Sequence, residues 1–294
     1  MVQKIIQEIS KVVIGKEKQI KLTLSAFLSE SHLLIEDIPG VGKTTLAHAF
    51  ASILELDFAR IQFTSDMMPS DIIGVNIFNT QKSVFEFKKG PIFNSFVLAD
   101  EINRASAKTQ SALLEAMSER TISIDATTYK LDQNFFVIAT KNPIEEHGVY
   151  TLPQSELDRF ALSFSLGYPS KKAQRAILEK KPLNYSELKK FPIKALEKLK
   201  FEVSKVHISD EIYDQIEDIL EYSRSSNKFE YGISTRGSID IVNIIKAWAL
   251  VNERDYVIPL DLEETLVHIV GHRLTLKEGN SDVQEMARLL IQQV

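Results

Sequence analysis

The stretch Leu34-Ile35-Glu36-Asp37-Ile38-Pro39-Gly40-Val41-Gly42-Lys43-Thr44-Thr45 decides how the rest of the chain is interpreted. An apolar run that ends at Ile35 predicts a buried strand, and apolar residues at helical spacing after Lys43 predict a helix. A strand, a glycine-rich loop and a helix in this order are the context of a phosphate-binding loop. Gly40 and Gly42 let backbone N–H groups approach an anion, and the helix N-terminus adds the positive end of its dipole.

The side chains of such a loop have separate roles. Lys43 would reach the terminal phosphates of a nucleotide, and the Thr44 hydroxyl would bind Mg²⁺. Asp37 stands where the full pattern G-x-x-x-x-G-K-[ST] has its first glycine, so an ordinary strand–turn–helix with a chance Gly-Lys-Thr stays open at this point. The candidate nucleotide-binding residues of the loop are Pro39, Gly40, Val41, Gly42, Lys43, Thr44 and Thr45.

Length and composition exclude several classes of protein. The 294 residues suffice for two domains, and the lack of cysteine excludes disulfides, Cys-ligated zinc and cysteine nucleophiles. The net charge of −5 argues against a broadly basic nucleic-acid binder. The N-terminus lacks the apolar core of a signal peptide, and the sequence has no apolar run of membrane-spanning length. We therefore expect a cytoplasmic location and no membrane span.

A pair of carboxylates ends the next apolar run. Phe96 to Ala99 predicts a short buried strand, and Asp100-Glu101 follows it directly. In an open α/β sheet the carboxyl ends of the strands are where ligands bind. A phosphate-loop ATPase needs one carboxylate beside Mg²⁺ and a second that orients or deprotonates water, which are the roles we expect for Asp100 and Glu101.

Two further segments are candidates with open alternatives. The apolar turn that contains Val13, Ile14 and Gly15 could cover a purine ring, or it could be a packed helix connection. Asn142 follows the predicted strand 134–140 and could bind a phosphate or the attacking water, although Asn is also a common turn residue.

The remaining patterns predict two hairpins and a helical C-terminal part. Segments 64–90 and 121–130 are predicted insertions that contain hairpins, and from Lys171 onward the sequence predicts helices without a sheet. Residues 171–205 carry 11 basic and 4 acidic side chains, which we interpret as the solvated face of helices and not as a nucleic-acid surface. We expect those helices to pack through Ile177, Leu178, Leu183, Leu188, Ile193, Leu196 and Leu199. His268 and His272 have metal-like spacing, but no third ligand accompanies them, so packing is the favoured role.

Taken together, these motifs resemble the MoxR family of AAA+ ATPases. The resemblance covers nearly the whole chain. The matching stretches are Leu33–Ala47, Arg60–Thr64, Pro69–Ile72, Gly90–Phe93, Leu98–Ala105, Thr109–Met117, Phe136–Thr140 with Asn142-Pro143, Leu157–Phe160, Ser234–Arg236, Ala247–Leu250 and Arg254–Val257. The departures are mild: Lys141 stands where the family commonly has Gln, and Thr235 replaces a more usual Pro.

The resemblance implies a fold and a set of residue roles. The fold would be an AAA+ αβα ATPase domain with a parallel sheet, about residues 1–168, followed by an all-α lid, about residues 169–294. Lys43, Thr44, Asp100 and Glu101 would have the roles given above. By the same resemblance, Asn142 would be the first sensor, Arg236 the sensor arginine of the lid, which also contacts the nucleotide, and Arg159 the arginine finger of a neighbouring subunit, with Arg104 as a second candidate.

The resemblance also implies a way of working. ATP and Mg²⁺ would be the cofactors, and the active form would be a homo-oligomeric ring, a hexamer, because one arginine is supplied by a neighbour. The function would be chaperone-like remodelling or maturation of a protein client together with a von Willebrand A-domain partner. The two hairpins would face the pore of the ring or a partner. The alternative is a nucleic-acid motor or loader, which the net acidic chain disfavours.

Overall fold

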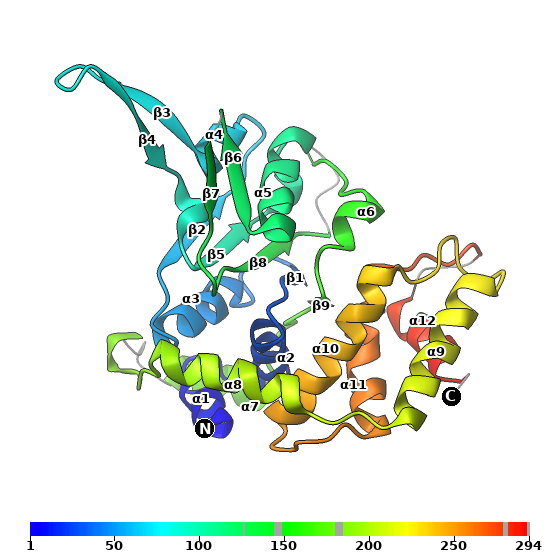
Figure 1. The fold of residues 1–294 in the computed structure, drawn as a ribbon. Coiled ribbons are helices and arrows are strands. Elements are labelled where there is room, and N and C mark those ends of the chain that lie inside the picture. The colour runs from blue at the N-terminus through cyan, green and yellow to red at the C-terminus, as the bar shows by residue number, and fades with distance from the viewer. Residues whose placement is uncertain (126, 144–148, 180–184, 279–281, 293–294) are drawn as a thin grey trace.

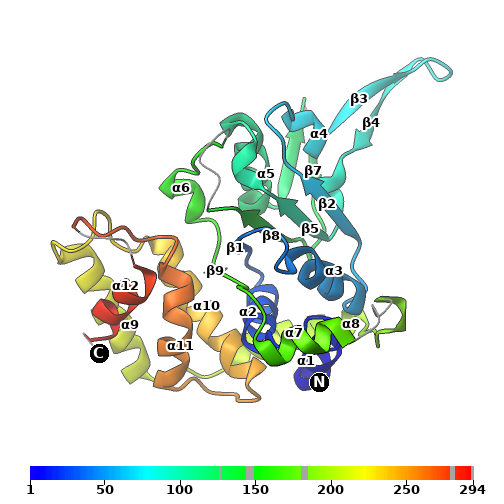
Figure 2. The same cartoon turned by 180° about the vertical axis from the view of Figure 1, so that it is seen from behind.

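The computed structural model describes residues 1–125, 127–143, 149–179, 185–278 and 282–292, and it places a layered α/β part beside a group of helices (Figure 1). A long hairpin projects from the far end of the α/β part, and the last helices lie at the opposite end (Figures 1 and 2).

Within the described residues, the central sheet has five strands in the order β2-β5-β8-β1-β9, and every neighbouring pair is parallel. The strands are β1 (Leu33–Glu36), β2 (Phe58–Gln62), β5 (Phe96–Asp100), β8 (Phe136–Lys141) and β9 (Leu162–Phe164). β5 and β8 are buried along almost their whole length, as expected of central parallel strands covered on both faces. The sequence analysis did not predict β9, because periodicity cannot assign so short an apolar run.

Helices cover both faces of the sheet. Leu33 and Ile35 of β1 pack into one hydrophobic cluster and Leu34 into another, as side chains that alternate across a strand must. The first cluster includes α1 (Val2–Ser10), α2 (Glu17–Leu28) and α3 (Lys43–Ile53). The second includes α5 (Ala107–Glu119), which Ser106 caps by accepting a hydrogen bond from the Thr109 N–H. The result is the predicted αβα sandwich.

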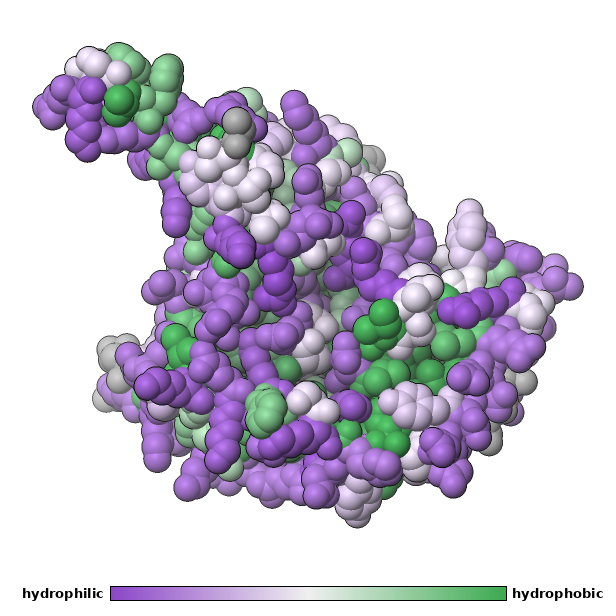
Figure 3. Space-filling view, in the orientation of Figure 1, coloured by the Kyte–Doolittle hydropathy of each residue, from purple (hydrophilic) through white to green (hydrophobic). Residues whose placement is uncertain are grey.

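Two hairpins branch from the sandwich, as predicted. The first consists of β3 (Gly74–Asn79) and β4 (Val84–Lys89), with α4 (Pro69–Ile73) before it and the short helix η1 (Pro91–Phe93) after it. The second consists of β6 (Thr121–Ile124) and β7 (Thr127–Lys130). The tip of the first carries exposed apolar side chains, among them Phe78 and Phe85, and Figure 3 shows apolar and polar side chains mixed there.

The C-terminal part is helical, as predicted. Its helices are α7 (Lys171–Glu179), η3 (Tyr185–Glu187), α8 (Ile193–Lys205), α9 (Asp210–Ser225), α10 (Thr235–Val251), α11 (Pro259–Val270) and α12 (Val283–Ile291). Two short helices, η2 (Ile102–Arg104) and α6 (Gln154–Leu157), belong to the α/β part. α10 packs against α2, α8 and α11, and its Trp248 is buried in the same cluster as α1–α3. One continuous core therefore joins the helices to one face of the sheet. Within the described residues, no helix has the combination of length and apolar character that crossing a bilayer requires.

The packing expected for residues 171–205 is correct at Leu188, Leu196 and Leu199 and wrong at Ile177, Leu178 and Ile193. Leu188, Leu196 and Leu199 are buried, but Leu178 is 77% exposed and Ile177 is also exposed. Only Ala173 of α7 is buried, because the helix touches the rest of the protein along one narrow face. Ile193 is exposed as well, and Leu183 lies outside the described residues.

Candidate nucleotide site

The sheet brings the predicted site segments to one edge. β8 lies between β1 and β5, with Ile35 opposite Thr140 and Ala99 opposite Ala139. The glycine loop follows β1. Asp100 is the last residue of β5 and Glu101 comes directly after it, and the buried Asn142 follows β8. Three segments that are far apart in sequence therefore meet at the carboxyl edge of the sheet, where open α/β folds bind ligands.

The glycine loop has the backbone that phosphate binding requires. Gly40 has φ of 81° and Gly42 has φ of 102°, a region that residues with a Cβ rarely adopt. A Cβ built on either glycine would meet nothing within 4 Å, so the space beside the loop is open. Lys43 begins α3, and its Nζ donates hydrogen bonds to the carbonyls of Asp37 (2.7 Å) and Ile38 (3.1 Å). A positive side chain and a helix N-terminus thus face an open loop, which fits a bound phosphate group.

Asp37 has a structural role that explains the missing glycine. Its carboxylate is buried and accepts hydrogen bonds from the N–H groups of Ile38 (2.8 Å) and Gly167 (2.7 Å). Its own N–H donates to the Lys141 carbonyl at 3.1 Å. The first position of the loop is therefore bound both to β8 and to the segment that leads into α7.

The apolar turn before α2 lies at the same place. Val13 is buried, and a Cβ on Gly15, whose φ is 73°, would come within 2.7 Å of the Ala173 Cβ in α7. The Lys16 Nζ donates to the carbonyls of Leu166 (2.5 Å) and Tyr168 (2.9 Å). Lys16, which follows the turn, and Asp37, which begins the loop, thus bond to the same segment, 166–168.

The carboxylate pair is held by specific polar contacts. Asp100 accepts hydrogen bonds from the Thr140 hydroxyl (2.6 Å) and from Arg60 Nη2 (2.7 Å). The Glu101 carboxylate accepts from Gln62 Nε2 (2.8 Å) and lies 3.0 Å from Arg104 Nε. Glu101 itself has a left-handed backbone, with φ of 58° and ψ of 49°.

Sequence reasoning missed the residues that hold this pair. Arg60, Gln62 and Thr140 were not assigned roles, although all three contact Asp100 or Glu101. A signal was present: the polar positions of the alternating strand β2 fall at its carboxyl end, and Gln62 pairs in register with Asp100. Only the neighbouring strand reveals what these side chains contact.

A hydroxyl and a carboxylate at this edge are oxygen donors of the kind that bind a magnesium ion together with nucleotide phosphates. Thr44, at the start of α3, and Asp100 are the two side chains expected to hold it. Within the described residues, no group of three or more His, Cys, Asp or Glu side chains could form a metal cage. Mg²⁺ in nucleotide sites needs no such cage, because phosphates and water supply most of its ligands.

The two C-terminal histidines pack as expected. His272 Nε2 donates to the Phe160 carbonyl at 2.6 Å, and burial lowers its pKa to about 3. His268 Nδ1 lies 3.3 Å from the Ser163 carbonyl, and burial lowers its pKa to about 4. Both rings are neutral near pH 7 and help to join α11 to the segment around β9.

The predicted arginines occupy three different environments. Arg104 pairs with Glu101 of its own chain. Arg159 follows α6 and donates from Nη1 to the Leu114 carbonyl (2.9 Å) and the Ser118 hydroxyl of α5. Arg236, in the first turn of α10, is 49% exposed and lies 3.9 Å from Asp158 Oδ2. The geometry of a single chain places Arg104 at its own carboxylates and Arg159 away from them.

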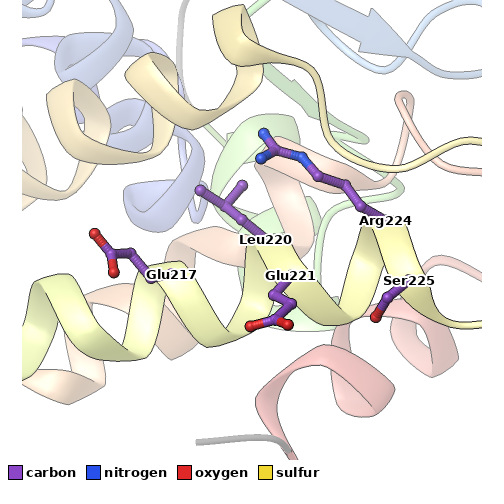
Figure 4. A pocket seen from close by; sticks show the side chains of 5 residues that line it. All are labelled: Glu217, Leu220, Glu221, Arg224 and Ser225. Carbon is purple, nitrogen blue, oxygen red and sulfur yellow. The ribbon is translucent and has the colours of Figure 1, made fainter.

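A hollow of about 440 Å³ on α9 lies apart from this edge and is lined by Glu217, Leu220, Glu221, Arg224 and Ser225 (Figure 4). These side chains all come from one helix, and none is a predicted site residue. We therefore assign the chemistry to the sheet edge and not to this hollow.

Comparisons with known proteins identify the family. Residues 32–162 match the model of the ATPase family associated with various cellular activities (AAA), and residues 221–292 match an AAA lid domain. The Mycobacterium tuberculosis chaperone MoxR1 is 36% identical over 284 residues, covering 93% of this chain and 75% of MoxR1. The uncharacterized Bacillus subtilis protein YeaC is 42% identical over 276 residues, covering 93% of this chain and 86% of YeaC.

A solved structure shows the same fold over the full length. The crystal structure of a provisionally assigned ATPase from Cytophaga hutchinsonii superposes with a TM-score of 0.90 at 37% identity, covering 100% of this chain and 94% of that one. The family models, the relatives and this shared fold show that the chain belongs to the MoxR family of AAA+ ATPases.

Proposed function

We propose that this chaperone-like ATPase hydrolyses ATP with Mg²⁺ in a homo-oligomeric ring, a hexamer, and uses the energy to remodel a protein client. The observation that carries the proposal is the position of Asp100 and Glu101. They lie at the same sheet edge as the glycine loop, and one strand, β8, separates their strand β5 from β1. A carboxylate pair and an open phosphate loop at this separation form the two walls of a phosphoryl-transfer site.

Each wall has its own task. The glycine loop and Lys43 bind and orient the phosphates, with Pro39, Val41 and Thr45 shaping the loop and the turn at Val13–Gly15 covering the base. Glu101 orients the attacking water and accepts its proton, and Asn142 hydrogen-bonds the water or the terminal phosphate. Mg²⁺, held by Thr44 and Asp100, would offset the charge of the phosphates.

We assign the remaining roles to two arginines. Arg236 acts as the sensor arginine on the nucleotide of its own chain, and Arg159 enters the site of the next subunit, which its hydrogen bonds to α5 support. An arginine supplied in trans makes hydrolysis depend on assembly. The site then lies between an α/β domain, residues 1–168, and a helical lid, residues 169–294.

The projecting hairpin supports a protein client. β3 and β4 carry the exposed side chains Ile77, Phe78 and Phe85, the last of them 71% exposed. Exposed apolar side chains on a projecting element are typical of a protein-binding surface. We propose that this hairpin contacts the client or a von Willebrand A-domain partner, and that the ring works in the cytoplasm.

The decisive experiment uses Glu101→Gln, which keeps the shape of the side chain and removes its charge. The variant should bind ATP, assemble and lose hydrolysis by about 100-fold or more, because a general base contributes at least that factor. The wild-type protein and an exposed-surface control, Glu217→Gln, should hydrolyse ATP at the same rate. Hydrolysis at the wild-type rate by Glu101→Gln would refute the assignment.

The same variant identifies the client. A ring arrested with ATP should retain a protein client, and replacing Phe78 and Phe85 by Ser in that background should release it. Recovery of nucleic acid in place of protein, with salt-dependent binding and DNA-stimulated hydrolysis, would favour the alternative of a nucleic-acid motor.

A further inference from the structure

A buried arginine after α11 joins three segments of the chain. The Arg273 side chain is 2% exposed, and its Nε donates to Asp158 Oδ1 at 3.0 Å while Nη2 pairs with Asp240 in α10. Its Nη1 donates to the carbonyls of Ala161 (3.1 Å) and Ile269 (3.0 Å). Nη2 also reaches the Asp158 carbonyl at 3.3 Å. These contacts occupy the five N–H groups of the guanidinium, so the arginine has one allowed orientation.

Asp158 in turn contacts the start of α10. The Ser234 hydroxyl lies 3.0 Å and 2.9 Å from its two carboxylate oxygens. Ser234 is also the N-cap of α10, where its oxygen accepts a hydrogen bond from the Gly237 N–H at 2.9 Å. The Asp158 carboxylate is thereby attached to the helix turn that carries Arg236.

Further contacts attach the neighbours of Asp158 to α11. Gln154 Nε2 donates to the carbonyls of His272 (3.1 Å) and Arg273, and His272 donates to the Phe160 carbonyl. The segment from Gln154 to Ala161 is thus bound to the end of α11 at several points. A shift of α10 and α11 must therefore move this segment with them.

Asp158 is next to both arginines for which we propose roles: Arg236, at the nucleotide of its own chain, and Arg159, at the site of the next subunit. Arg236 Nη1 is 3.9 Å from its carboxylate, and Arg159 is its neighbour in sequence. We infer that Asp158 is a positioning residue that couples the Arg236 of one nucleotide site to the Arg159 that completes the next site. The inference rests on the proposed roles of these two arginines.

The contacts differ in strength in the way that such coupling requires. The Arg236–Asp158 pair is long and half exposed, so it contributes little and Arg236 can turn toward a phosphate at small cost. In the Arg273–Asp158 pair the arginine is buried, the carboxylate is 17% exposed and two hydrogen bonds join them, so this pair persists. When Arg236 and the start of α10 move, Asp158 follows through Ser234 and Arg273. Arg159 then changes its position relative to α5, where it now donates to the Leu114 carbonyl.

The expected property is cooperativity between sites. ATP bound in one subunit would orient the arginine that serves the next subunit, so hydrolysis should depend on ATP concentration with a Hill coefficient above 1. The test compares Asp158→Asn with wild type in the full-length assembled protein. Three quantities are measured: the Hill coefficient of hydrolysis, the affinity for a fluorescent ATP analogue, and Tm.

Two further variants make the test specific. Ser234→Ala removes the link to α10 and leaves the Arg273 pair intact, and it replaces Asp158→Asn if that variant does not fold. Asp261→Asn is the control, because the buried Asp261 is likewise paired with an arginine, Arg254, but bonds to neither Arg159 nor Arg236. It should lower Tm without changing the Hill coefficient.

The outcomes separate the inference from the proposed function. Asp158→Asn and Ser234→Ala should lower the Hill coefficient to about 1 while the variants still bind the ATP analogue. The inference is overturned if both keep the wild-type coefficient, if Asp261→Asn lowers it equally, or if the wild-type coefficient is already about 1. The proposed function fails on a different result, which is wild-type hydrolysis by Glu101→Gln.

Discussion

The glycine loop and the cluster of Arg273, Asp158 and Asp240 are both polar, yet the chain holds them in opposite ways. Lys43 bonds to carbonyls five and six residues before it, and its side chain is only partly buried. Arg273 is buried and pairs with residues 115 and 33 positions away. Local, half-exposed bonds can be exchanged for a ligand at little cost, whereas buried long-range bonds fix geometry. One region is therefore built to exchange partners and the other to keep them.

The largest expected effect is a loss of ATP hydrolysis when Arg159 is replaced. Arg159→Ala should assemble and bind ATP but lose hydrolysis by about 10³-fold, the usual value of an arginine finger. Mixing Arg159→Ala with Glu101→Gln subunits should restore part of the activity, because each supplies what the other lacks. Measuring the rates of both variants alone and mixed provides the check.

Arg104→Ala is the matched comparison for that mixing experiment. Its side chain contacts Glu101 of the same chain, so we expect no recovery when it is mixed with Glu101→Gln. Recovery with Arg104→Ala and none with Arg159→Ala would assign the finger to Arg104.

The next effect concerns stability. Arg273→Met keeps much of the volume of the side chain and leaves Asp158 and Asp240 without their buried partner. We expect a loss of about 3–5 kcal/mol in the free energy of unfolding, the usual cost of breaking a buried pair. Burial already raises the pKa of Asp240, so the variant should recover some stability as the pH is lowered. Denaturant unfolding at two pH values measures the loss of unfolding free energy and its pH dependence. A loss below about 1 kcal/mol would mean that the cluster is not rigid.

The contrasting variant is Lys43→Ala in the loop. ATP affinity should fall by about 100-fold, near 3 kcal/mol, because the phosphates lose a direct positive partner. The free energy of unfolding should hardly change, since Nζ bonds only to nearby, partly exposed carbonyls. Isothermal titration and denaturant unfolding on one preparation test both halves. A large loss of stability would contradict the contrast between the two regions.

The smallest effect is a pH dependence in the core behind the sheet. His32 Nδ1 accepts from the Val137 N–H at 3.1 Å and Nε2 donates to the Met117 carbonyl at 3.1 Å, so the ring is held neutral. Burial lowers its pKa to about 3 from 6.5. The unfolded chain therefore takes up a proton that the folded chain refuses between these values, and stability falls as the pH drops from 6.5 toward 3.

The measurable quantity is the slope of stability against pH. His32 should contribute about 1.4 kcal/mol per pH unit inside that window, and His32→Gln should remove this share of the slope. His207→Gln, at an exposed position, is the matched His-to-Gln comparison. Unfolding curves at pH 6.0 and 5.0 suffice, and an equal slope for His32→Gln and wild type would show that His32 takes up a proton in the folded state.

The sequence predicted much of the fold because its signals were local. The loop, the strands 96–99 and 134–140 and the helix around Trp248 each combine a periodic apolar pattern with turn residues, and the structure has them all. What remained hidden depends on contacts between distant segments. The short strand β9 is defined by its pairing with β1, and the roles of Arg60 and Gln62 by their neighbour β5.

The same limit applies to the polar residues around the site. Asp37 was a departure from a pattern until Gly167, 130 positions later, was found to donate to it. The contacts of Asp158 with Arg273 and Ser234 are likewise invisible in the sequence, because those residues lie 115 and 76 positions away. Conversely, the exposure of Leu178 was missed because an apolar pattern shows which face can pack and not whether a neighbour is present.

The left-handed backbone of Glu101 carries an evolutionary consequence. A residue with a Cβ in that conformation lowers the stability of the folded state by about 1–2 kcal/mol. Glycine at this position would avoid most of that loss. On the proposed role of Glu101, this cost in stability is the counterpart of a carboxylate held at the end of β5. On the same proposal, a lineage released from selection for hydrolysis would be expected to drift toward glycine or asparagine at this position, with higher thermostability and no hydrolysis.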